Sequence, residues 1–152
     1  TPLQMEMVAA GIANDGVVMQ PYLVATERDA NLSVVATTSP REFSTAVTPE
    51  VAQTMTDMMV DVVENGTARA AAISGVTVAA KTGTAESGVD DGTTASNPHA
   101  WMVAFAPAEA PRVAVAALVV NGGTPGQSEY TGGQLAGPIV RSVLQAALGN
   151  NS

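Results

Sequence analysis

The chain has 152 residues, and its 14 acidic and six basic side chains give it a net charge of -8. Surfaces that bind nucleic acid or anionic membranes are rich in lysine and arginine, so this charge argues against both partners. The chain lacks cysteine and has one histidine, which excludes disulfides, thiolate metal sites and sites built from several histidines. We expect one domain with a hydrophobic core, and neither a metal nor a cofactor.

Capping signals predict two helices in the first half of the chain. Thr1-Pro2 has the form of an N-cap followed by proline at the first helical position, and residues 14–16 (NDG) end this helix. Thr48-Pro49 repeats the signal, and Asn65-Gly66 ends the second helix. An apolar stripe at helical spacing marks its buried face: Val51, Met55, Met58, Met59, Val62 and Val63. We interpret the methionines as core filler and not as a cofactor or target groove.

The segment between these helices carries weaker signals. Residues 17–24 are apolar around Pro21 and predict an extended segment. Residues 32–36 favour a short strand, and Ser39-Pro40 marks a turn. The remainder of residues 25–47 has no clear periodicity.

The second half of the chain predicts a sheet and a final helix. Residues 76–84 alternate with β-branched side chains and predict a strand, while the polar, glycine-rich residues 86–98 predict a mobile loop. Residues 99–105 and 112–121 are apolar runs that predict an antiparallel hairpin, and residues 135–148 an amphipathic helix. Few polar residues interrupt the strands, so we expect an α+β fold whose antiparallel sheet is covered by helices on both faces.

The most informative motif is Lys81-Thr82-Gly83-Thr84, at the end of the first predicted strand. It combines a cation, two hydroxyls and a backbone unit without a side chain, which are the groups needed to hold a carboxylate and an oxyanion. Taken alone, the Lys-Thr-Gly triplet is also typical of a solvated strand end with a glycine turn.

Other residues that invite a functional reading have plainer explanations. His99 begins a strand after a loop and is interpreted as structural, although a lone histidine is also a candidate general base. Trp101 either packs behind the strand or lines a cleft, and we favour packing. Asp90-Asp91 lacks further metal ligands, so we assign no metal site. Gly122-Gly123 and Gly132-Gly133 suit either a ligand-facing loop or ordinary turns.

The order of these elements and two longer segments resemble the class B penicillin-binding proteins. Residues 81–86 (KTGTAE) and 99–107 (HAWMVAFAP) are similar to the third motif and the following strand of that family. Residues 1–4 (TPLQ), with residues 13–16 (ANDG) and Pro21, are similar to the helix and strand entry upstream. The resemblance covers nearly the whole chain, and the alanine-rich composition is closest to the actinobacterial members.

The family performs serine acyl transfer with three motifs, S-x-x-K, S-x-N and K-T-G. In this chain no serine has a lysine three residues later or an asparagine two residues later, and Lys81 is the only lysine. The resemblance implies that the nucleophile lies in a segment preceding this chain. We therefore expect residues 1–152 to be the C-terminal part of a single transpeptidase domain, with the rest of that domain as their partner.

The resemblance also implies a role for each motif residue. Lys81 would donate to the S-x-N serine and create a positive field for the substrate carboxylate. The hydroxyls of Thr82 and Thr84 would bind that carboxylate, and Gly83 would let ligand and backbone approach closely. The backbone N–H of Thr84, together with that of the absent serine, would form the oxyanion hole.

The implied function is a D-Ala-D-Ala transpeptidase that cross-links peptidoglycan stem peptides outside the cytoplasmic membrane and binds β-lactams. Membrane anchoring would come only from a segment before this chain. Two alternatives remain open at this point. A serine β-lactamase shares the third motif and would turn antibiotics over rapidly, and a non-catalytic sensor module would hold ligands without turnover.

Overall fold

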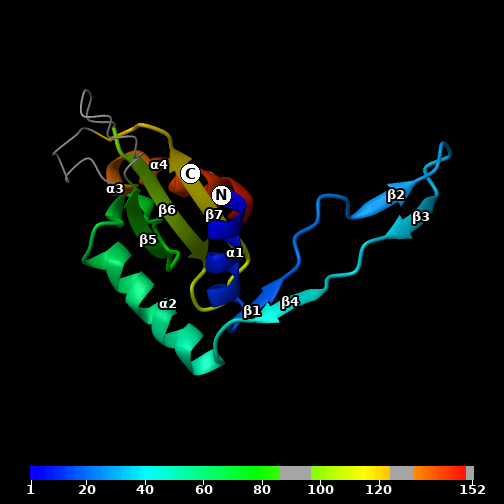
Figure 1. Ribbon diagram of the computed structural model, residues 1–152, viewed down its shortest axis with the longest axis horizontal. Coiled ribbons are helices and arrows are strands. Elements are labelled where there is room, and N and C mark those ends of the chain that lie inside the picture. The colour runs from blue at the N-terminus through cyan, green and yellow to red at the C-terminus, as the bar shows by residue number, and fades with distance from the viewer. Residues whose placement is uncertain (86–96, 124–131, 150–152) are drawn as a thin grey trace, which may run out of the picture.

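An antiparallel sheet forms the centre of the computed structural model, which describes residues 1–85, 97–123 and 132–149. Its strands lie in the order β5-β6-β7 (Figure 1), and their bounds are Ala79–Ala85, His99–Ala106 and Val113–Val119. The register pairs Ala79 with Phe105 and Ala106 with Val113, so the predicted hairpin of β6 and β7 is confirmed.

The first of these strands begins later than the sequence predicts. Its expected start at Val76 is wrong, because Val76 forms only an isolated bridge with Ile73 around a turn at Ser74-Gly75. The chain there folds back on itself, and regular pairing starts only at Ala79, which lies opposite Phe105 near the end of β6.

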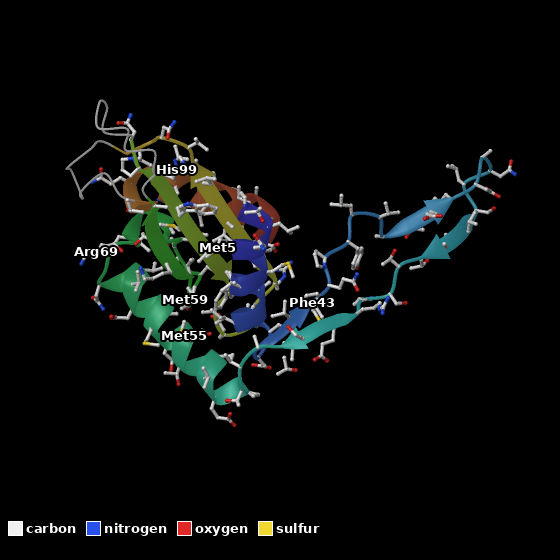
Figure 2. The ribbon with its side chains drawn as sticks, viewed as in Figure 1. Met5, Phe43, Met55, Met59, Arg69 and His99 are labelled. Carbon is white, nitrogen blue, oxygen red and sulfur yellow. The ribbon has the colours of Figure 1, made fainter. Side chains whose placement is uncertain are left out.

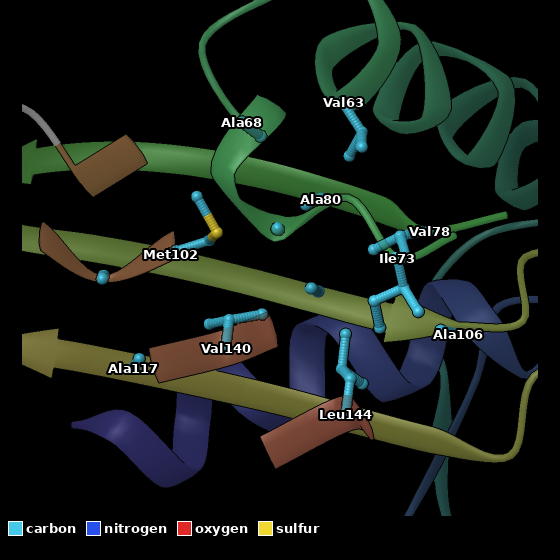
Figure 3. Close-up of a cluster of buried hydrophobic side chains, with 13 residues drawn as sticks. Val63, Ala68, Ile73, Val78, Ala80, Met102, Ala106, Ala117, Val140 and Leu144 are labelled. Carbon is cyan, nitrogen blue, oxygen red and sulfur yellow. The ribbon is translucent and has the colours of Figure 1, made fainter. Parts of the chain in front are cut away.

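Helices cover both faces of the sheet, as predicted. The helix α4 (Gly137–Leu148) packs on one face, and Figure 3 shows its Val140 and Leu144 directed at the strands. The short 3-10 helix η1 (Arg69–Ala71) packs on the same side. The buried members of this cluster are Val63, Ala68, Ala71, Ile73, Val78, Ala80, Met102, Ala104, Ala106, Ala117, Ala136, Val140 and Leu144.

The opposite face is covered by α1 (Pro2–Ala13) and α2 (Pro49–Glu64). Its smaller cluster has four buried members, Ala9, Met59, Ala79 and Phe105. The helix α2 runs beside β5 and contributes to both clusters, through Met59 on this face and Val63 on the other. The observed architecture is thus an α+β fold with a sheet between two helical layers.

The predicted helix starts are confirmed by their caps. Thr1 forms a capping box with Gln4, whose backbone N–H donates to the Thr1 hydroxyl at 3.3 Å. The Thr48 hydroxyl accepts from the N–H of Val51 at 3.4 Å. In the first turn of α2, the backbone N–H of Glu50 and then the Thr48 hydroxyl hold the pKa of the Glu50 carboxyl below its usual value.

The methionine stripe on α2 is only partly core filler. Met59 is buried, but Met55 and Met58 are 36% and 53% exposed, so the prediction is wrong for these two. Figure 2 labels Met55 and Met59 on the helix. The helix meets the sheet along a narrow line of residues, Ala52, Thr56, Met59 and Val63. Thr56 can lie on this line because its hydroxyl donates to the Ala52 carbonyl at 2.9 Å. The methionines beside the line remain uncovered.

Residues 19–46 form a long two-stranded arm that leaves the body of the molecule (Figure 1). Near the body, β1 (Val17–Met19) pairs with β4 (Glu42–Thr45), and further out β2 (Thr26–Arg28) pairs with β3 (Val34–Thr37). The predicted strand over residues 32–36 corresponds to β3, displaced by one or two residues. Every residue from 19 to 46 is exposed, and the large apolar side chains of the arm include Leu23, Leu32, Val35 and Phe43.

The chain contains two phenylalanines, which provide a matched test of where the core lies. Phe105 is fully buried, whereas Phe43 is 68% exposed on the arm. We expect Phe105→Ala to lower the free energy of unfolding by about 3–5 kcal/mol. Phe43→Ala should change it by less than about 0.5 kcal/mol. Chemical denaturation of the longer protein that carries this domain checks both values, and equal losses in the two variants would contradict the assignment.

Candidate functional site

The Lys-Thr-Gly-Thr motif lies on β5, which pairs with β6 along one edge only in the described part of the chain. Lys81 is opposite Val103, on the sheet face that α1 and α2 cover. The side chain of Lys81 is exposed, and its ammonium donates to the Thr82 carbonyl at 2.9 Å. This leaves further ammonium protons for a ligand, because lysine carries three.

Thr82 and Thr84 lie on the other face of the strand, because side chains alternate along β5. Their partners across the ladder are Met102 and Ala100. Thr84 is exposed and Thr82 is half-buried. The motif therefore presents its cation on one side of an open strand edge and its hydroxyls on the other.

The Thr82 hydroxyl has a partner that sequence reasoning missed. Its oxygen lies 2.7 Å from the hydroxyl oxygen of Thr67, and either of the two atoms can be the donor. A hydroxyl has one proton and two lone pairs, so this contact leaves Thr82 with capacity for a second hydrogen bond. Thr67 follows the Asn65-Gly66 helix stop, where nothing in the sequence distinguishes it from an ordinary turn residue.

The Gly132-Gly133 pair permits close backbone packing around the motif strand. A Cβ on Gly132, the first residue of α3 (Gly132–Leu135), would lie 1.8 Å from the Trp101 carbonyl oxygen and 2.9 Å from that of Gly83. A Cβ on Gly133 would lie 2.1 Å from the carbonyl oxygen of Thr67. The two readings left open for this pair, a ligand-facing loop and an ordinary turn, do not describe its place in α3, where both glycines allow a close approach of backbone to backbone beside the motif strand.

The remaining sequence candidates are placed as follows. His99 accepts a hydrogen bond at Nδ1 from the backbone N–H of Asn121, at 3.0 Å, which fits its structural interpretation. Trp101 is half-buried, opposite Gly83, with its Cβ 3.2 Å from the place of a Cβ on that glycine. The predicted loop covers residues 86–98. Of these, residues 86–96, which include Asp90-Asp91, lie outside the described residues.

Within the motif, Lys81 and Thr84 are exposed, and Thr82 and Gly83 are half-buried. A cavity of about 500 Å³ lies elsewhere, between the second half of α2, η1 and residues 72–78, and its lining includes Val63, Glu64 and Arg69. No group of three acidic or histidine side chains that suits a metal ion occurs in residues 1–85, 97–123 and 132–149. In chemical terms, the motif can hold an anion but has no S-x-x-K nucleophile beside it in this chain.

Comparison with known protein families shows which family the chain belongs to. The model of the penicillin binding protein transpeptidase domain matches residues 1–145. The chain belongs to this family, which confirms the resemblance drawn from the motif and the strand that follows it.

The relatives are peptidoglycan D,D-transpeptidases. The chain is 51% identical to peptidoglycan D,D-transpeptidase PbpA of Mycolicibacterium smegmatis, over 100% of this chain and 30% of the relative. It is 48% identical to PbpA of Mycobacterium tuberculosis, over 97% of this chain and 29% of the relative. The expected closeness to actinobacterial members is confirmed, and the chain spans about a third of the length of these relatives.

Solved structures agree with the sequence match. The crystal structure of penicillin-binding protein A from Mycobacterium tuberculosis superposes with a TM-score of 0.85 at 47% identity, over 97% of this chain and 32% of that chain. The same protein as a ceftriaxone acyl-enzyme complex gives a TM-score of 0.86 at 47% identity, with the same coverage. The fold described above is therefore that of a transpeptidase domain in the region that the chain spans.

The packing of Gly132 behind the motif strand can be tested by substitution. We expect Gly132→Ala to lower the free energy of unfolding by about 3 kcal/mol, because its Cβ would meet backbone atoms that cannot rotate away. Gly149→Ala is the matched control, since its Cβ would meet nothing within 4 Å and only the positive φ of 78° opposes it. That control should cost about 1 kcal/mol. Urea denaturation of the longer protein measures both, and a harmless Gly132→Ala would refute the close approach.

Proposed function

We propose that this chain is the C-terminal part of a peptidoglycan D,D-transpeptidase domain and supplies the Lys-Thr-Gly wall of its active site. The observation that carries the proposal is the exposed Lys81 ammonium on the open edge strand of a transpeptidase fold. The chain has no serine in an S-x-x-K or S-x-N arrangement, so the nucleophile belongs to another part of the same domain.

In this proposal the motif binds negative charge at two stages of acyl transfer, first on the substrate carboxylate and then on the oxyanion. Lys81 attracts the carboxylate of a D-Ala-D-Ala stem peptide, or that of a β-lactam, to the edge of β5. The hydroxyls of Thr82 and Thr84 bind the same carboxylate from the other side of the open strand edge, and Gly83 leaves room for the ligand beside the strand. The N–H of Thr84 pairs with that of the nucleophilic serine to stabilise the oxyanion, and removal of such a donor costs about 3 kcal/mol of transition-state energy.

A transpeptidase is favoured over a serine β-lactamase by the relatives. They are named D,D-transpeptidases, and the solved relative exists as acyl-enzyme complexes with ceftriaxone, imipenem and penicillin G. A covalent adduct that survives long enough for structure determination is typical of slow deacylation. We therefore propose that β-lactams inhibit the whole protein and that stem peptides are its substrates. The proposal involves no cofactor.

We infer that the whole protein works at the extracytoplasmic face of the bacterial cell membrane, where peptidoglycan is assembled in cell growth and division. None of the helices in the described residues is long and apolar enough to cross a membrane.

The rest of the domain would also cover surfaces that the described residues leave open. On α1, Leu3 and Val8 are about half exposed, as are Val51 and Met58 on α2. The outer edge of β7 has no pairing strand in the described part of the chain. Exposed apolar patches and unpaired strand edges favour association, so these surfaces suit contact with the nucleophile-bearing part.

Replacement of the motif lysine tests its role. We expect Lys81→Ala to slow acylation of the full-length protein by a fluorescent penicillin by about 10- to 100-fold, because a charge-assisted hydrogen bond to the carboxylate is lost. Arg112→Ala is the control, because Arg112 is also an exposed cation. Its neighbour Val113 pairs with Ala106, at the end of β6 opposite to His99. It should acylate at the wild-type rate, and unchanged labelling of Lys81→Ala would exclude the assigned role.

The isolated chain provides a second test. Because it lacks the S-x-x-K serine, it should form no covalent adduct with penicillin under conditions that label the full-length protein. We also expect light scattering to detect aggregates at micromolar concentration, since the open apolar surfaces then face water. A penicillin adduct on this chain alone would place a nucleophile within residues 1–152.

A further inference from the structure

Two hydrogen bonds join the start of β6 to the chain leaving β7. The backbone N–H of Asn121 donates to Nδ1 of His99 at 3.0 Å, and the N–H of Gly123 donates to the Pro98 carbonyl at 2.9 Å. Figure 2 shows His99 at the end of the sheet, away from the arm. A Cβ on Gly123 would lie 2.5 Å from Pro98, so the two segments are in direct contact as well as hydrogen-bonded.

This connection lies beside the part of the motif strand that carries Thr84. His99 pairs with Ala85, and the next residue, Ala100, pairs with both Thr84 and Val119. The last regular pair of β6 and β7 is therefore Ala100 with Val119. Beyond it, among the described residues, the His99 side chain and the Pro98 carbonyl hold the two strands together. The start of β6 pairs with the part of β5 that carries Thr84, and the His99 side chain helps to hold that start in place.

The hydrogen bond requires one protonation state of the imidazole. Nδ1 accepts from a backbone N–H, so it must carry a lone pair, and the proton of the neutral ring then lies on Nε2. Protonation would put a second proton on the ring, at Nδ1, and turn a donor-acceptor contact into two opposed donors. Histidine is the side chain for which this change falls between about pH 5 and 8.

Few other charges lie on the described elements around His99. On β5, β7 and α3 the only charged side chain is Lys81, which pairs with Val103, four residues further along β6. The two longer helices that pack on β6 and β7 add the half-buried carboxylate Glu6 on α1 and the exposed cation Arg141 on α4. Among these groups, His99 is the one that accepts a hydrogen bond from a backbone N–H at the end of the β6–β7 pair.

We propose that His99 is a positioning residue for acyl transfer: its neutral Nδ1 fastens the end of β7 to the start of β6, and so fixes the end of β5 that carries Thr84. Protonation of the ring releases this fastening and slows acylation. The inference rests on the proposed function for its catalytic consequence, but the hydrogen bond itself can be tested separately.

Asparagine and glutamine distinguish a positioning role from a generally structural one. In His99→Asn, the side-chain carbonyl oxygen would occupy nearly the place of Nδ1 and accept the same N–H, without titrating. His99→Gln is the matched control, because its acceptor lies one bond further out, at the place of Nε2. Both variants are polar, so a difference between them reports the position of the acceptor.

The first experiment measures the rate of acylation of the full-length protein by a fluorescent penicillin from pH 5.5 to 8. The wild-type rate should fall about 5- to 10-fold toward acid pH, as expected for one lost hydrogen bond. His99→Asn should stay within about twofold of wild type at pH 8 and lose this acid decline. His99→Gln should be slower by a similar factor of about 5- to 10-fold, that of one hydrogen bond, at every pH. Equal rates for the two variants, or an unchanged acid decline in His99→Asn, would overturn the proposal.

The second experiment measures backbone hydrogen exchange in residues 113–123 of the same full-length proteins, at the alkaline end of the same pH range. Exchange at the end of this segment should be faster in His99→Gln than in wild type, and His99→Asn should restore protection. This measurement does not require catalysis. If the wild-type protein formed no penicillin adduct, the proposed function would be wrong. Hydrogen exchange would still show whether the His99 hydrogen bond fastens the end of β7 to the start of β6. Identical exchange in all three proteins would refute the fastening even if acylation occurred.

Discussion

The antiparallel pairing of β5 with β6 is the interaction on which the rest of the structure depends. It joins Ala79 to Phe105 in the core and Ala85 to His99 at the surface, so one ladder connects the hydrophobic interior to the motif. Helices cover both faces of this ladder, while the outer edge of β5 has no partner strand in the described residues. The same strand is thus paired on one side and accessible on the other, as the proposed ligand-holding wall requires.

Backbone contacts hold this wall more closely than side chains do. Gly132 and Gly133 bring the start of α3 against the carbonyl groups of Gly83, Trp101 and Thr67. The Thr67 hydroxyl fixes Thr82 from the same side. The Lys81 ammonium, in contrast, donates to the neighbouring carbonyl of Thr82, which is a local contact within its own strand. The geometry of the strand is therefore built within this chain, whereas the electrostatic partners of its cation are expected from the other part of the domain.

The sequence predicted the features that depend on local patterns. Proline after threonine marked both helix starts, and the Lys-Thr-Gly-Thr motif, together with the strand that follows it and the order of the elements, indicated the family. Thr67 was missed because its importance comes from a contact fifteen residues away in the chain, which no local pattern encodes. Met55 and Met58 were wrongly assigned to the core because periodicity identifies an apolar face but not how much of it is covered. Apart from β3, the strands of the arm were not predicted, since a ribbon exposed on all sides has no buried face to impose alternation.

The position of α2 has a consequence for how the domain unfolds. Its Met59 and Val63 belong to different buried clusters on opposite faces of the sheet, so neither helical layer can detach without disturbing the helix that serves both. The two layers and the sheet should behave as one cooperative unit in native-state fluctuations. The arm contributes no buried side chain over residues 19–46 and stands outside that unit, so we expect its pairing to fluctuate separately from the strand that carries the motif.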